Sequence, residues 1–198
     1  MEINNIPENL VLENNFVALR PLELSDIEYL IEYSINEPEI WFYSLAQGSG
    51  KENMIKYISD AVLARAANKE FAFIVYDKTK NKYAGSTRFY DIQLPYKTIQ
   101  LGYTWYGKEF QGTGLNKNCK YLMLEYAFEK LGLERVEFRA DNRNERSKAA
   151  MLSLGCKVDG ILRSNLPDNI GGRRDSIILS ILREEWFNTV KENLKLKI

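Results

Sequence analysis

The pattern of apolar residues changes abruptly in the middle of the chain. Every second residue from Ile99 to Trp105 is apolar, which predicts a strand whose odd-numbered side chains share one face. From Leu115 to Leu131 the apolar residues recur at helical spacing instead, which predicts a long amphipathic helix. The short segment between the two patterns therefore predicts a turn that leads from a strand directly into a helix.

The same reading along the rest of the chain predicts further strands and helices. A charged turn at residues 77–82 and a short turn at 94–96 join three consecutive strands, which predicts an antiparallel meander. The strand after the long helix can lie parallel to the strand before it, through a right-handed crossover. The predicted strands are 16–20, 71–76, 83–91, 99–106, 135–140, 156–163 and 176–182, and the predicted helices are 27–34, 51–68, 115–131, 145–154 and 183–198.

These elements predict one α/β (α+β) domain that spans residues 1–198. Its sheet is expected to be mixed but mostly antiparallel, with about seven strands and helices on both faces. Residues 1–14 are polar and are expected to form a loosely attached lead-in, and residues 183–198 are expected to form a C-terminal helix.

Composition narrows the possible functions. The 27 basic and 27 acidic residues cancel, so we expect no nucleic-acid partner, and no apolar run is long enough for a membrane span. Histidine is absent, which excludes a histidine base and most catalytic zinc sites, so we expect no metal. The start of the chain lacks the layout of a signal peptide, and Cys119 and Cys156 are expected to be packed thiols, so we expect a cytoplasmic protein.

Two glycines, Gly112 and Gly114, lie in the turn between the strand and the long helix. A helix N-terminus without bulky side chains exposes free N–H groups at the positive end of the helix dipole, which attracts anions. The turn therefore predicts a pyrophosphate site, and the alternative is an ordinary strand-to-helix turn. Lys117 occupies the place of the third glycine of a dinucleotide fingerprint, and the spacing of a P-loop is also absent.

Two motifs, in this order, resemble those of the GNAT superfamily of N-acetyltransferases. Residues 111–116, Gln-Gly-Thr-Gly-Leu-Asn, are similar to its Gln/Arg-x-x-Gly-x-Gly/Ala motif, from which Asn116 departs at the small last position. Residues 144–147, Asn-Glu-Arg-Ser, followed by Leu-Gly-Cys at 154–156, resemble its Asn-x-x-Ser…Leu-Gly-Phe signature with cysteine in place of phenylalanine. The order of the predicted elements is also similar to that of the superfamily.

The two ends of the chain resemble one branch of this superfamily. Leu-Arg-Pro-Leu at 19–22, and Asp175 followed by Glu185-Trp186, are similar to the Rim-type branch, which includes enzymes that acetylate the N-termini of ribosomal proteins. The resemblance implies an N-acetyltransferase that moves the acetyl group of acetyl-coenzyme A (acetyl-CoA) directly to a primary amine. The acceptor remains open between a protein N-terminus, a polyamine, an amino sugar and an amino acid. A non-catalytic acyl-CoA sensor on the same fold is the alternative, and a monomer or homodimer is expected.

The resemblance also implies roles for single residues. The fourth and fifth predicted strands would splay apart, so that the pantetheine arm binds main-chain groups of the fourth strand as an added strand would. Ser147 would protonate the departing thiolate, with helix capping as the alternative. Asn144 would position the loop or the pantetheine amide, with turn formation as the alternative. The residues implied to bind acetyl-CoA are Thr104, Trp105, Tyr106, Gln111, Gly112, Thr113, Gly114, Leu115, Asn116 and Asn144.

Two further roles stay unassigned. A general base is not identified; Asp91, Glu137 and Asp175 lie near predicted strand ends, but each also fits a solvated surface charge. The 3′-phosphate of the cofactor could meet basic residues after the glycine turn, which equally fit a solvated face. These basic residues are Lys117, Lys120, Arg146 and Lys148.

Overall fold

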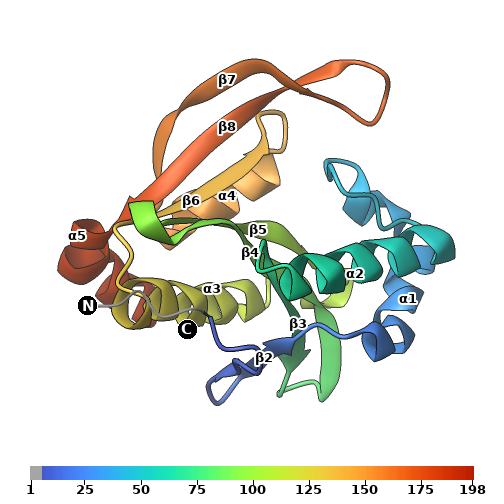
Figure 1. The fold of residues 1–198 in the computed structure, drawn as a ribbon, viewed down its shortest axis with the longest axis horizontal. Coiled ribbons are helices and arrows are strands. Elements are labelled where there is room, and N and C mark those ends of the chain that lie inside the picture. The colour runs from blue at the N-terminus through green and yellow to red at the C-terminus, as the bar shows by residue number, and fades with distance from the viewer. Residues whose placement is uncertain (1–5) are drawn as a thin grey trace.

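The computed structural model describes residues 6–198, which form one eight-stranded sheet with strand order β1-β2-β3-β4-β5-β6-β8-β7 (Figure 1). Neighbouring strands in this part of the chain are antiparallel except for the parallel pair of β5 and β6. The strands are β1 (Leu12–Glu13), β2 (Val17–Pro21), β3 (Phe71–Asp77), β4 (Lys82–Gln93), β5 (Thr98–Tyr106), β6 (Arg135–Asp141), β7 (Lys157–Pro167) and β8 (Arg173–Leu182).

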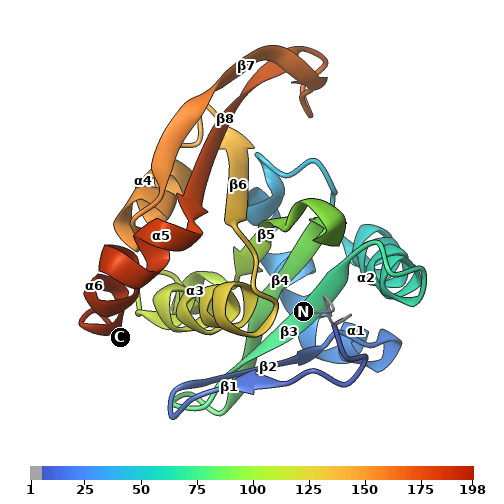
Figure 2. The same ribbon diagram turned by 60° about the vertical axis from the view of Figure 1, so that its left-hand side comes forward.

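Helices cover both faces of the sheet, with α1 and α2 on one face and α3, α4 and the C-terminal helices on the other (Figure 2). Each face carries its own apolar core, and the core on the α3 side is the larger. The helices are α1 (Ile27–Asn36), α2 (Lys51–Ala66), α3 (Leu115–Glu125), α4 (Glu145–Leu154), α5 (Arg183–Glu185) and α6 (Lys191–Lys195), with π-helical turns at Tyr126–Lys130 and Trp186–Val190.

The predicted fold class is confirmed, and the sheet has one more strand than the seven expected. The added strand, β1, lies inside the segment that was expected to be loosely attached, and it pairs with β2 through Leu12 and Leu19. Ile6 and Leu10 also pack against the larger core. The prediction of a loose lead-in is therefore wrong for residues 6–14, and residues 1–5 lie outside the described residues.

Strand β5 does not keep the regular alternation that the sequence predicted. Its pairing with β4 shifts between Gly102 and Trp105, so that one extra residue of β5 bulges out of the ladder, and Tyr103 has a positive φ of 48°. Ile99 packs in the core on the α3 side, whereas Trp105 packs in the core on the α1–α2 side. The prediction that the odd-numbered side chains share one face is wrong, because the bulge reverses the alternation.

Strands β5 and β6 separate soon after they meet. Only Thr98, Ile99 and Gln100 of β5 pair with β6, and residues 138–141 of β6 pair with β8 alone. Residues 101–106 of β5 therefore have an open edge toward β6. This is the splay that the family resemblance implied between the fourth and fifth predicted strands, which are β5 and β6.

Candidate active site

The turn that enters α3 is built around two glycines in left-handed backbone conformations. The φ angle is 77° at Gly112 and 88° at Gly114, and Gly114 is the N-cap of α3. No side chain caps this helix, and its first turn contains no acidic residue. The positive end of the α3 dipole therefore faces outward without a neutralising group.

Free backbone donors surround this helix end. The N–H groups of Gly112, Thr113 and Gly114 donate to no acceptor among the described residues, and those of the first helical turn have no intrahelical partner. Gln111 differs, because its N–H donates to the Lys108 carbonyl at 3.1 Å and its Nε2 to the Tyr106 carbonyl at 2.7 Å. Of the residues expected to bind the pyrophosphate, Gln111 thus braces the turn, and the free donors begin at Gly112.

The space over the turn is open as well. A Cβ atom built on Gly112 or Gly114 would meet no atom within 4 Å, so the space beside both glycines is open. An anion the size of a phosphate needs both the donors and this space. The residues present fit the diphosphate of acetyl-CoA, and Asn116 does not close the site, because its Oδ1 lies 3.3 Å from the Tyr106 hydroxyl.

Three residues of β5 lie along its open edge, close to the glycine turn. The side chains of Trp105 and Tyr106 are each 6% exposed and pack in opposite cores, so they offer their main chain rather than their rings. Thr104, in contrast, is exposed. The arrangement is suitable for an extended ligand that pairs with the backbone of β5.

The turn between β6 and α4 holds Asn144 and Ser147. Asn144 is the N-cap of α4, and its Oδ1 accepts a hydrogen bond of 3.0 Å from the Ser147 N–H. Asn144 therefore has the capping role that was the alternative for Ser147. The Ser147 hydroxyl is half-buried and makes no hydrogen bond with the part of the chain that the structure describes, so it is free to meet a ligand.

A buried lysine lies beneath the bulge of β5. Lys120 is 4% exposed, and its Nζ donates to the Thr87 and Thr104 hydroxyls at 2.7 and 2.6 Å. No carboxylate within residues 6–198 forms an ion pair with it, and burial lowers the pKa of Lys120 to about 7. The suggestion that Lys120 could reach the 3′-phosphate is wrong, because its side chain points into the sheet. Lys120 lies three, four and seven residues before Met123, Leu124 and Ala127, and so it shares a helix face with these apolar residues. This spacing is the sequence signal that could have revealed the burial of Lys120.

The three carboxylates considered as general bases already have partners. Asp91 accepts from Gln93 and Gln100 at 2.9 and 2.6 Å, Glu137 pairs with Arg135 and Arg139, and Asp175 accepts from the Ser164 N–H. None is therefore assigned as a base. In residues 6–198 no group of three or more potential metal ligands occurs, and no helix is long and apolar enough to cross a membrane.

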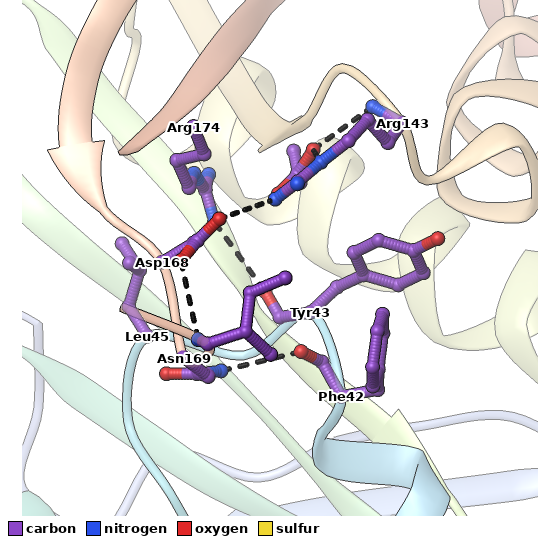
Figure 3. A pocket seen from close by; sticks show the side chains of 9 residues that line it. Phe42, Tyr43, Leu45, Arg143, Asp168, Asn169 and Arg174 are labelled. Carbon is purple, nitrogen blue, oxygen red and sulfur yellow. Dashed lines mark hydrogen bonds and ion pairs between the residues drawn. The ribbon is translucent and has the colours of Figure 1, made fainter. Parts of the chain in front are cut away.

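A pocket lies beside the β6–α4 turn, where three distant segments meet (Figure 3). Asn169, in the loop between β7 and β8, donates to the Ser44 carbonyl at 2.7 Å and so ties that loop to the segment after α1. Sequence reasoning missed Asp141 and Arg174: Asp141 ends a strand of alternating apolar and charged residues, Arg174 lies at the start of an apolar strand, and neither position belongs to a motif. The residues that line the pocket are Phe42, Tyr43, Leu45, Asp141, Arg143, Asp168, Asn169, Ile170 and Arg174.

Comparison with known proteins agrees with this geometry. The family model described as an acetyltransferase (GNAT) domain matches residues 17–157. YdaF of Bacillus subtilis (strain 168), named as a candidate ribosomal N-acetyltransferase, is 29% identical over 178 residues, which are 87% of this chain and 94% of that protein.

Solved structures extend the comparison. A candidate acetyltransferase from T. thermophilus superposes with a TM-score of 0.85 at 29% identity, covering 98% of each chain. The ribosomal-protein-S5-alanine acetyltransferase from Vibrio fischeri shares the fold, with a TM-score of 0.71 at 23% identity over 90% of this chain and 99% of its own. The predicted resemblance to the superfamily and its Rim-type branch is confirmed, and the chain belongs to the GNAT acetyltransferase family.

Proposed function

We propose that this protein transfers the acetyl group of acetyl-CoA directly to a primary amine. The observation that carries the proposal is the free helix end at Gly112–Gly114, next to the open edge of β5. The free helix end suits a diphosphate, and the open edge of β5 suits an extended arm that contains amide groups. Acetyl-CoA contains a diphosphate followed by such an arm.

The residues of the site divide the chemistry among them. Acetyl-CoA, when bound, supplies a thioester whose carbonyl must be polarised before an amine attacks. Main-chain groups of Thr104, Trp105 and Tyr106 bind the arm, and a main-chain N–H of this edge polarises the thioester carbonyl and stabilises the developing oxyanion. The Ser147 hydroxyl, which has no hydrogen-bond partner within residues 6–198, donates a proton to the departing thiolate. Asn144 holds that serine in place by capping α4.

The acceptor is a protein N-terminus or a small amine. An α-amine, with a reference pKa of about 7.7–8, is partly neutral near pH 7, whereas a lysine side chain at about 10.4 is almost wholly charged. An α-amine therefore needs less help from a base, which suits a protein in which the carboxylates considered as bases already have partners. We further propose a cytoplasmic monomer or homodimer that needs neither a metal nor a nucleic acid.

An acetyl-transfer screen tests the proposed function. The protein is incubated with acetyl-CoA and a panel of peptides, polyamines, amino sugars and amino acids, and acetylated products are detected by mass spectrometry. We expect thiol release that depends on the amine. If acetyl-CoA binds but no amine in the panel causes thiol release, the result would support the non-catalytic acyl-CoA sensor instead. If acetyl-CoA does not bind, both the acetyltransferase and the sensor would be rejected.

Ser147→Ala is expected to slow turnover about 10- to 100-fold while the affinity for acetyl-CoA stays within about twofold, because the hydroxyl acts on the leaving group alone. The measurement is steady-state thiol release combined with calorimetry. Ser153→Ala is the matched control, since Ser153 lies on the same helix and its Oγ donates to the Ala150 carbonyl at 2.7 Å. Equal turnover in the two variants would remove Ser147 from the mechanism.

A further inference from the structure

The pocket beside the β6–α4 turn contains four charged side chains, which are those of Asp141, Arg143, Asp168 and Arg174. Three of them interact, because Arg143 bonds to both carboxylates. Arg143 donates to Asp141 through Nη2 at 2.7 Å and Nε at 3.0 Å, and its Nη2 also lies 3.2 Å from Asp168 (Figure 3). Both carboxylates accept main-chain bonds in addition, from the Arg143 N–H to Asp141 and from the Gly172 N–H to Asp168. The acidic groups of the pocket therefore have little capacity left for a ligand.

Arg174, the fourth charged group, is in the opposite situation. Its side chain comes from β8 and is 6% exposed, yet its two hydrogen bonds, to the Tyr43 carbonyl and the Ser176 Oγ, are both 3.3 Å long. No carboxylate of residues 6–198 lies within ion-pair distance of it. Burial lowers the pKa of Arg174, and the charge of Asp141, a carboxylate that Arg143 already engages, offsets this effect only in part.

Another buried arginine, Arg88, has a close counter-charge and aromatic neighbours, although its Nε and Nη2 have no hydrogen-bond partner among the described residues. Arg88 is 4% exposed, but it forms an ion pair of 2.6 Å with Glu70 and lies over the rings of Tyr57 and Tyr103 at 4.7 and 4.3 Å. Among residues 6–198, Arg174 has neither an ion pair with a carboxylate nor an aromatic ring beneath its guanidinium. A guanidinium carries five donors in a planar fork that matches a carboxylate, so an anion that enters the pocket would satisfy it.

The position of the pocket connects it to the reaction. Its lining residues Asp141 and Arg143 immediately precede Asn144, whose N–H donates to the Asp141 carbonyl at 2.9 Å. The pocket therefore adjoins the turn that holds Ser147 and lies on the side formed by the segment after α1 and the β7–β8 loop. A ligand group seated at Arg174 would be carried by the acceptor and not by the diphosphate end of the cofactor.

We propose that Arg174 binds a carboxylate of the amine acceptor, so that the preferred acceptors are amines with a carboxylate close to the reacting nitrogen. The inference rests on the proposed acetyl transfer and adds the acceptor class to it. A free amino acid supplies the carboxylate at its own Cα, and a peptide supplies it from an acidic residue next to its N-terminus. Both sources present the same planar pair of oxygens to the guanidinium.

Paired acceptors test the proposal in the wild-type protein. Alanine is compared with alaninamide, and the dipeptide amide Ala-Asp with Ala-Asn. We expect kcat/KM to be about tenfold or more higher for the acid in at least one pair, mainly through KM, because a charged hydrogen bond is lost with the amide. The pair that responds identifies the source of the carboxylate. The alanine pair is a stringent test, since the free carboxylate makes the neighbouring amine more basic and so less available as the neutral nucleophile.

Variants assign the preference to one side chain. In Arg174→Gln the preference for the acid is expected to disappear, and Arg174→Lys is expected to restore part of it. Arg173→Gln is the matched control, because Arg173 is the exposed neighbour on the same strand and its side chain donates to the Ser164 carbonyl at 2.6 Å. Retained preference in Arg174→Gln, or no preference in either pair of acceptors with the wild type, would overturn the proposal.

A binding measurement separates this inference from the proposed function. Calorimetry is carried out without acetyl-CoA on two pairs of acetylated ligands. The first pair is N-acetylalanine and N-acetylalaninamide, and the second is the N-acetylated Ala-Asp amide and the N-acetylated Ala-Asn amide. In the responding pair we expect the Kd of the acid to be lower than that of the amide by about tenfold or more. Failure of every amine to be acetylated would reject the proposed function, and the calorimetric comparison would still decide whether Arg174 binds a carboxylate. Equal binding within both pairs would reject the contact even if acetyl transfer occurs.

Discussion

Gly114→Glu is expected to reduce the affinity for acetyl-CoA at least about 100-fold, because a carboxylate would occupy the open space that faces the free N–H groups and would repel the diphosphate. Gly114 also has a φ of 88°, a conformation that costs a residue with a side chain about 1–2 kcal/mol. The measurement is isothermal titration calorimetry with acetyl-CoA.

Two further variants separate charge from backbone strain. Gly132→Glu is the matched control, since Gly132 also has a positive φ, of 67°, and a Cβ built there would meet nothing within 4 Å. Gly132 lies past the other end of the helix, roughly 25 Å away, so this variant is expected to lose stability but keep its affinity. Gly114→Ala introduces the strain without the charge and is expected to bind more tightly than Gly114→Glu. Unchanged affinity in Gly114→Glu would show that the diphosphate binds elsewhere.

Lys120→Met is expected to stabilise the protein by about 1–4 kcal/mol near pH 6, because it removes a buried cation that bonds to two hydroxyl groups and forms no ion pair with a carboxylate of the described residues. The Thr87 and Thr104 hydroxyls, 2.8 Å apart, can still bond to each other. The measurement is urea unfolding of the wild type and the variant at about pH 6 and about pH 9.

The sign of the pH dependence follows from the direction of the shift. The pKa of Lys120 falls from 10.5 to about 7 on folding, so between these values the unfolded chain binds more protons than the folded one. The free energy of unfolding of the wild type therefore rises with pH in this window, and the full cost of burying the charge applies below it. The advantage of Lys120→Met is expected to be greatest near pH 6 and to shrink toward pH 10.

The control for this experiment is Lys117→Met, on the same helix but partly exposed. It is expected to change the free energy of unfolding by no more than about 0.5 kcal/mol at either pH. A Lys120→Met variant that is less stable than the wild type at low pH, or whose advantage does not depend on pH, would show that the amine is not held as an uncompensated charge.

Local patterns were sufficient for most of the fold, because the strands and helices carry clear periodicity and the glycine turn has a chemistry of its own. They did not reveal the bulge at Tyr103, since a period of two continues unbroken through residues 99–105. Gly102, immediately before Tyr103, is the one local signal of an irregular position in this strand. Strand β1 has only two residues and exists through its pairing with β2.

The parts of the candidate site that are neighbours in sequence could be proposed from the sequence, and the parts that come from distant segments could not. Residues 111–116 and 144–147 form short motifs, whereas the pocket joins Tyr43 to Arg174 across most of the chain. Lys120 was misplaced because lysine is ordinarily a surface residue, and its burial depends on two threonine hydroxyls from different strands. No periodicity within one segment encodes such contacts.

The hydrogen bond from Asn169 to the Ser44 carbonyl has a consequence for redesign. The two loops that it fastens together contain none of the residues of the glycine turn or of the open edge of β5. Specificity for a different amine should therefore be transplantable by exchanging residues 42–47 and 166–172 as a matched set from a related enzyme. If only one of the two segments were exchanged, the hydrogen bond between Asn169 and the Ser44 carbonyl would lose one of its matched partners.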